Sequence, residues 1–218
     1  MAAVIHSVIG RVQPGRYEDF LAMSLEVSKL YDRLGCGNTR LSEAAAAGEA
    51  SGSWVFSAEF DSLDAWGQFS DDIGADPELL AILGRIRAVN SPVTVEQQNV
   101  AIELPVRTSK PGRGSITEIY VSKPLPGRYE EALASGARAC AFAEKHGAVR
   151  ARVFQINHAG LGVGSVMVSW EVENGRALAK LLQAWSDDAE GQTIGAELNS
   201  ATPSSVLVFG GTYVDIPL

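Results

Sequence analysis

Two ionisable side chains, His6 and Glu118, lie in the middle of two short segments that are rich in β-branched residues. An imidazole titrates near neutral pH and a neighbouring carboxylate can hold the same proton, so together they could remove a proton from an activated C–H or O–H bond. Tyr120 follows Glu118 by two residues and would share its face of a strand. The structural alternative is a buried histidine whose hydrogen bonds are satisfied inside a partly polar interface.

Arginine and glutamate also occur together twice, as Arg40 with Glu59 and as Arg152 with Glu171. In each case the arginine lies in one predicted strand and the glutamate in the next, and a tight hairpin would place them opposite each other. Because the combination occurs twice, we expect two structural ion pairs, each within its own hairpin. The alternative is that the arginines bind an anion or a carboxylate ligand.

The remaining histidines and the two cysteines form no metal-binding pattern. His146 and His158 have no companion at ligand spacing, and Cys36 and Cys140 belong to no CxxC motif. We therefore expect no metal ion, and two reduced thiols of the kind found in cytoplasmic proteins.

These residues belong to two copies of one unit. Pro14–Glu18 (PGRYE) recurs 112 residues later as Pro126–Glu130. At this offset Ala3–Ala65 aligns without a gap to Ser115–Ala177, and 16 of the 63 pairs are identical. Such self-similarity indicates a tandem repeat.

The repeat divides the chain into residues 1–104 and residues 115–218. Between them, residues 105–114 (PVRTSKPGRG) are rich in proline, glycine and basic side chains, which is typical of an exposed linker. Each copy predicts the order β-α-β-β-α-β, with a first helix that begins at the Pro-Gly pair and an extra short helix before the last strand.

The third predicted strand of each copy has one apolar face and one mixed face. The mixed faces are formed by Val55, Ser57 and Glu59 in the first copy and by Met167, Ser169 and Glu171 in the second. We expect the apolar faces to pack on helices and the mixed faces to look at one another, since both would otherwise stay exposed to water. The side chains of the first strands that we expect to point into the same space are Val4, His6 and Val8, and Ile116, Glu118 and Tyr120.

A family resemblance is carried by Pro14–Glu18 after the first strand and by the strand-to-helix junction Glu59–Trp66 (EFDSLDAW). The second copy repeats it at Pro126–Glu130 and, more weakly, at Trp170–Asn174. The chain resembles the dimeric α+β-barrel superfamily, which includes antibiotic-biosynthesis-type monooxygenases and NIPSNAP-like proteins. This implies an α+β fold in which two ferredoxin-like repeats pack sheet to sheet and form one intramolecular barrel with a cavity.

The resemblance does not extend to the haem chemistry of that superfamily. Its haem-degrading members use an asparagine in the first strand, a tryptophan, and a histidine in the second helix. This sequence has no asparagine in its first strands, and it has Phe69 and Leu181 at the positions of the helical histidine. We therefore expect no cofactor and, if the protein is an enzyme, a cofactor-independent monooxygenase or isomerase that uses His6, Glu118 or Tyr120.

Composition limits the partners. The 218 residues include 26 acidic and 18 basic side chains, a formal net charge of −8. Recognition of nucleic acid or of an anionic membrane needs clustered lysine and arginine, so we expect neither partner. The opening MAAVIHSVIG lacks the basic residues of a signal peptide, and no apolar run is long enough to span a membrane.

The primary prediction is a cytoplasmic protein that binds a small, partly apolar molecule in the cavity between its two copies. The candidate cavity residues are His6, Glu118, Tyr120, Arg40, Arg152, Glu59 and Glu171. The first alternative is the cofactor-independent enzyme, acting in the same cavity. The second alternative is a non-catalytic scaffold or interaction protein with a fully packed barrel. A homo-oligomer is compatible with all three.

Overall fold

The computed structural model describes residues 3–218. Within them, the elements of the first copy are β1 (Val4–Val12), α1 (Tyr17–Arg33), β2 (Gly37–Ala46), β3 (Trp54–Phe60), α2 (Leu63–Ala75), α3 (Pro77–Arg87) and β4 (Val93–Glu103). Those of the second copy are β5 (Ile116–Pro124), α4 (Tyr129–Lys145), β6 (Val149–His158), β7 (Val166–Val172), α5 (Gly175–Asp187), α6 (Ala189–Leu198) and β8 (Ser205–Ile216). Short 3₁₀ turns, η1 (Gly48–Ala50) and η2 (Gly160–Gly162), lie in the β2–β3 and β6–β7 hairpins. The predicted order is confirmed, including the extra helix before each last strand.

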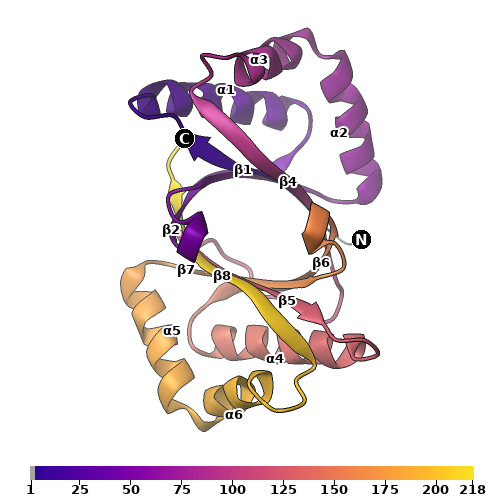
Figure 1. Ribbon diagram of the computed structural model, residues 1–218, viewed down its shortest axis with the longest axis vertical. Coiled ribbons are helices and arrows are strands. Elements are labelled where there is room, and N and C mark those ends of the chain that lie inside the picture. The colour runs from indigo at the N-terminus through magenta and orange to yellow at the C-terminus, as the bar shows by residue number, and fades with distance from the viewer. Residues whose placement is uncertain (1–2) are drawn as a thin grey trace.

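The strands close into one antiparallel barrel in the order β1-β3-β2-β8-β5-β7-β6-β4. Each copy supplies one half, and the halves join along two seams, β2 with β8 and β4 with β6. Helices α1–α3 cover the outside of one half and α4–α6 the outside of the other, with the barrel between them (Figure 1). The predicted α+β architecture of two ferredoxin-like repeats packed sheet to sheet is therefore confirmed.

The helix ends carry residues that suit their positions. Ser62 Oγ accepts the backbone N–H of Ala65 at 3.1 Å, and Asn174 Oδ1 accepts two N–H groups of the next turn at 3.0 and 3.1 Å. The first helices stop at Gly35 and Gly147, whose φ angles of +83° and +99° are left-handed values that glycine adopts without a Cβ clash. Within residues 3–218, the helices are too short or too polar to cross a membrane.

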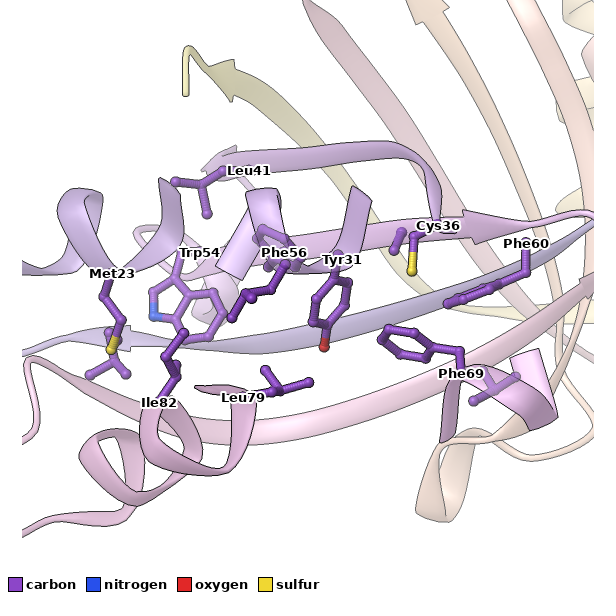
Figure 2. Close-up of a cluster of buried hydrophobic side chains, with 14 of the residues drawn as sticks. Met23, Tyr31, Cys36, Leu41, Trp54, Phe56, Phe60, Phe69, Leu79 and Ile82 are labelled. Carbon is purple, nitrogen blue, oxygen red and sulfur yellow. The ribbon is translucent and has the colours of Figure 1, made fainter. Parts of the chain in front are cut away.

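An aromatic core lies between the sheet and the helices of the first copy. Trp54, Phe56 and Phe60 project from β3 toward the helices, where Tyr31 and Phe69 pack against them (Figure 2). The rings of Tyr31 and Phe69 meet edge to face with centroids 4.7 Å apart, a favourable arrangement for their quadrupoles. The apolar face of β3 therefore lies on the helix side, as predicted.

The second copy fills the same layer with smaller side chains on its first helix. A Cβ atom added at Gly136 would lie 2.9 Å from Cγ1 of Val168, so α4 is in direct contact with β7. Cys140 on the same helix faces the backbone carbonyl of Arg152 at 3.5 Å. Cys140 and Cys36 are both buried free thiols.

The segment that connects the copies is anchored to the second one. Glu144, buried on α4, accepts hydrogen bonds from the guanidinium group of Arg107 and, at 2.7 Å, from the backbone N–H of Lys110. Burial opposes ionisation of this carboxyl group, but these hydrogen bonds and the charge of Arg107 hold the pKa of Glu144 below its usual range. Basic residues predicted in an exposed linker thus fix the segment to α4.

Candidate functional site

A cavity of about 550 Å³ lies inside the barrel, between its two halves. Strand β1 lines it with Ile5, Ser7 and Ile9, and β5 lines it with Thr117 and Ile119. The mixed faces of β3 and β7 also line this barrel cavity, as predicted. Its wall therefore offers both apolar surface and hydrogen-bonding groups.

The predicted orientation of the first strand is wrong. His6 lies opposite Ala58 of β3, and side chains directly opposite in an antiparallel pair share one face of the sheet. Ala58 belongs to the apolar face that packs in the helix-side core. Val4, His6 and Val8 therefore point away from the barrel cavity, and the face predictions for β1 and β3 could not both hold in one sheet.

The same correction applies to Ile116, Glu118 and Tyr120 in β5. Glu118 lies opposite Trp170, on the helix side of the second half, and it is only 3% exposed. Its carboxylate accepts hydrogen bonds from the hydroxyl of Tyr120, at 2.9 Å, and from the hydroxyl of Thr212. Tyr120 stacks on Trp170, and burial together with the charge of Glu118 raises the pKa of Tyr120.

His6 lies in a second cavity, of about 610 Å³, between the sheet and the helices of the first copy. Tyr31 and Trp54 contribute aromatic walls to this helix–sheet cavity. Burial lowers the pKa of His6, and its hydrogen bond with Gln98 offsets this only in part. Because His6 and Glu118 face the helices of different halves, with the barrel between them, the predicted proton-sharing pair does not form.

The four predicted ion-pair residues meet at one end of the barrel cavity, but with exchanged partners. Arg40 Nη2 lies 2.8 Å from Glu171 Oε2, and the two Nη atoms of Arg152 lie 3.1 and 2.9 Å from the carboxylate of Glu59. Each arginine therefore pairs with the glutamate of the other copy. The predicted pairs within single hairpins, Arg40 with Glu59 and Arg152 with Glu171, are wrong.

The exchange follows from an irregularity in each hairpin. The register of β2 against β3 shifts between Gly37 and Arg40, so that Arg40 lies opposite Ser57 and not opposite Glu59. The second hairpin has the same shift. A bulge of this kind shifts the pairing of the strands, so that each arginine lies opposite a serine and not opposite the glutamate of its own hairpin.

Arg150, which the sequence pattern did not single out, contacts both glutamates at this end of the cavity. Its φ angle is +48°, and Asn38 at the equivalent position has +46°, values that are uncommon for residues other than glycine. The Arg150 guanidinium lies 2.5 Å from Glu59 and 3.3 Å from Glu171, and Asn38 Nδ2 donates to Glu59 at 2.5 Å. The available signal was the spacing of Arg150 and Arg152, two residues apart on one strand.

The ionic floor of the barrel cavity is the cluster of Arg40, Arg150, Arg152, Glu59 and Glu171. Two further carboxylates adjoin it, since Glu103 lies 3.6 Å from Arg152 and Asp215 lies 3.7 Å from Arg40. Burial would raise the pKa of Glu59, but Arg152, Arg150 and Asn38 together hold it below its usual range. The positive charges of the floor are thus already compensated by carboxylates of the protein.

The residues at the haem-associated positions do not fit an iron ligand. Phe69 and Leu181 are each 1% exposed, and the ring of Phe69 packs on Phe60 and Tyr31 with centroids 4.9 and 4.7 Å apart. Among residues 3–218, no group of three His, Cys, Asp or Glu side chains is arranged to hold a metal ion.

Solved structures of other proteins share this fold. A protein provisionally named a chlorite dismutase aligns with 100% of this chain and 96% of its own, with a TM-score of 0.58 and 11% identity. A protein of Fusobacterium nucleatum provisionally named a monooxygenase aligns with 99% of this chain and 93% of its own, with a TM-score of 0.63 and 7% identity. An anthrone oxidase-like protein aligns over 99% and 92%, with a TM-score of 0.59 and 13% identity. No family model and no curated protein matches the sequence. At these identities the likeness establishes the fold, a barrel of two ferredoxin-like halves, and not the activity.

Proposed function

We propose that this protein binds a small, partly apolar molecule in the barrel cavity between its two copies. The cavity itself carries the proposal. Protein interiors are otherwise close-packed, with few voids larger than a water molecule. A space of about 550 Å³ instead matches small-molecule sites, which span roughly 300–1,000 Å³.

The two ends of the barrel cavity differ in exposure, since Arg40, Arg152 and Glu171 of the floor are buried. Strand β1 runs from Ile5, which lies opposite Glu59 of the ionic floor, to Arg11 near its other end. There the wall includes the exposed side chains of Arg11, Glu96 and Val208, and Arg11 Nε lies 3.2 Å from Glu96. A ligand would therefore enter at the end opposite the floor.

The lining supports binding more than proton transfer. Tyr213 lines the cavity, and burial raises its pKa to about 12, so its hydroxyl stays protonated at neutral pH. Glu59 is held ionised by the arginines around it. His6 lies in the helix–sheet cavity. The polar groups that remain are suited to hydrogen bonds with a ligand.

Filling the cavity tests the proposal. Nile red, a neutral dye whose emission rises in apolar surroundings, is titrated into wild type and into two variants. Ile119→Trp projects an indole ring into the barrel cavity and obstructs it, and Val27→Trp does the same in the helix–sheet cavity as the matched control. We expect Ile119→Trp to lose binding and Val27→Trp to keep it, with circular dichroism and thermal unfolding confirming that both fold. Binding that survives Ile119→Trp, or that is lost only in Val27→Trp, contradicts the proposal.

The lowered pKa of His6 favours a second candidate function, a cofactor-independent monooxygenase or isomerase. A neutral imidazole beside the aromatic walls of Tyr31 and Trp54 can accept a proton from an enolisable substrate. Structural neighbours named as monooxygenases support this candidate. It would act in the helix–sheet cavity. Oxygen uptake and solvent-deuterium exchange on enolisable test substrates measure it, and equal rates in wild type and His6→Gln would exclude it.

The scaffold alternative requires a fully packed barrel, which the barrel cavity argues against.

Cys36 and Cys140 are buried free thiols, which supports a reducing compartment such as the cytoplasm as the place where the protein works. The homo-oligomer stays a prediction.

A further inference from the structure

The two walls of the barrel cavity differ in polarity at three equivalent positions of the repeat, whereas Ser57 and Ser169 are identical and Thr117 replaces Ile5. The equivalence is fixed by register, because Ile9 lies opposite Gln97 in the first half and Val121 lies opposite Phe209 in the second. The first half lines the cavity with Ser7, Gln97 and Asn99, where the second half has Ile119, Phe209 and Gly211. The first half therefore presents hydrogen-bonding groups where the second presents apolar surface.

The polar side chains of the first half form one row across its strands. Ser7 of β1 lies directly opposite Ser57 of β3 and Asn99 of β4, and side chains in this relation share a face about 4.5–5.5 Å apart. Arg40 of β2 extends the row on the far side of Ser57. We call Ser57, Ser7 and Asn99 the polar row.

The polar row keeps hydrogen-bonding capacity for a ligand. In the described part of the chain, the hydroxyls of Ser7 and Ser57 bond to no other protein group, and all three side chains of the row line the cavity. Asn99 Oδ1 accepts a hydrogen bond from Gln97 at 2.6 Å, which leaves its amide nitrogen free to donate. Two hydroxyls and one amide thus face the cavity from a single wall.

The opposing wall belongs to the second half. Ile119, Phe209 and Tyr213 pack in one apolar cluster, which also includes Val55 of the first half. Val121 and Met167 pack in another, which also includes Ile5 and Ala101 of the first half. A molecule in the cavity would therefore meet the three side chains of the polar row on one side, and on the other mainly the apolar side chains of Ile119, Phe209 and Met167, with Thr117 and Ser169 beside them.

We propose that the ligand of the barrel cavity is a neutral, rigid, saturated ring molecule whose hydroxyl groups project from one face. This inference rests on the proposed function. The polar row and Ile119 line the cavity from different halves, so a flat fused-ring molecule could lay one face on the polar row and the other on Ile119. Hydroxyls on saturated rings can project from the ring face toward the polar row, whereas aromatic hydroxyls stay in the ring plane. An anionic group would gain little, because carboxylates already compensate the ionic floor.

Two isomeric probes test the inference. Methyl chenodeoxycholate carries its two hydroxyls on one face of a steroid nucleus, and methyl ursodeoxycholate carries one on each face. Competition against Nile red gives both affinities. We expect wild type to favour the one-faced isomer about tenfold, the effect of one further satisfied hydrogen bond. Ser7→Ala and Asn99→Ala should bring the ratio near one, whereas Gln98→Ala, the adjacent residue on the opposite face, should leave it unchanged.

The outcomes separate this inference from the proposed function. The inference is overturned if wild type binds both isomers equally or if neither isomer competes with Nile red. It is also overturned if the preference for the one-faced isomer survives both Ser7→Ala and Asn99→Ala. In each of these cases, loss of Nile red binding in Ile119→Trp would still uphold the barrel cavity as a binding site. If Ile119→Trp binds Nile red as wild type does, the proposed function fails, and the inference fails with it.

Discussion

Replacing Arg152 by methionine tests the crossed ion pairs of the ionic floor. The side chains of Arg152 and Glu59 are 10% and 18% exposed, so the substitution leaves a carboxylate in a largely dry site. Removing one partner of a buried pair costs about 3–5 kcal/mol. Glu59 keeps Arg150 and Asn38, each at 2.5 Å. We therefore expect the free energy of unfolding to fall by about 3 kcal/mol, the lower limit of that range.

Urea unfolding at pH 7, followed by tryptophan fluorescence, measures the loss, and double-mutant cycles identify the partner. Adding Glu59→Gln to Arg152→Met should recover part of the stability, because the stranded charge is removed, with a coupling of about 1–3 kcal/mol. Adding Glu171→Gln should not, because Glu171 pairs with Arg40 at 2.8 Å. A larger coupling of Arg152 to Glu171 than to Glu59 would refute the crossed arrangement and restore pairing within the hairpin.

Three further outcomes are expected. Burial raises the pKa values of Cys36 and Cys140 to about 12, so both thiols should resist Ellman's reagent at pH 8 until the protein unfolds. Burial lowers the pKa of His6 below 6.5. As pH falls through 6.5, the unfolded chain therefore binds a proton at His6 that the folded chain does not. The free energy of unfolding should decline over this range and level off below the pKa of the folded state. That decline, followed by urea unfolding, should shrink in His6→Gln. Gly136→Ala would bring a Cβ within 2.9 Å of a valine methyl group on β7 and should lower the melting temperature through about 1–3 kcal/mol of overpacking.

The architecture could be predicted because the sequence repeats. The recurrence of Pro14–Glu18 at Pro126–Glu130 defined two equivalent units, and the strict alternation in Trp54–Phe60 assigned its faces. Strand β1 was different, because both of its faces carry apolar side chains: Val4 and Val8 on one, Ile5 and Ile9 on the other. The alternation of residue types therefore does not indicate which face is turned to the helices. The choice is made by pairing with β3, a tertiary contact that also fixes the side on which His6 lies.

The composition of the ionic floor was largely predictable, but its connections were not. The spacing of Arg40 and Glu59 indicated an ion pair near the cavity, and both residues are there. Their partners depend on a bulge in each hairpin and on closure of the barrel across the seams. The left-handed backbone of Arg150 has no local sequence signal, because an arginine at that conformation is stabilised by distant carboxylates.

Fusion of the two units allows an arrangement that two identical chains could not hold. Arg150 contacts both Glu59 and Glu171, which are equivalent residues of the two copies, so it lies near the axis that relates them. A second guanidinium group at Asn38, which also contacts Glu59, would bring like charges together. In a symmetric dimer both positions would carry the same residue. The chain instead places asparagine on one side and arginine on the other, and the same freedom allows Ser7 and Ile119 to occupy equivalent positions of the barrel cavity. The asymmetry of the floor and that of the walls thus have one origin: in a fused chain, two equivalent positions can carry different residues.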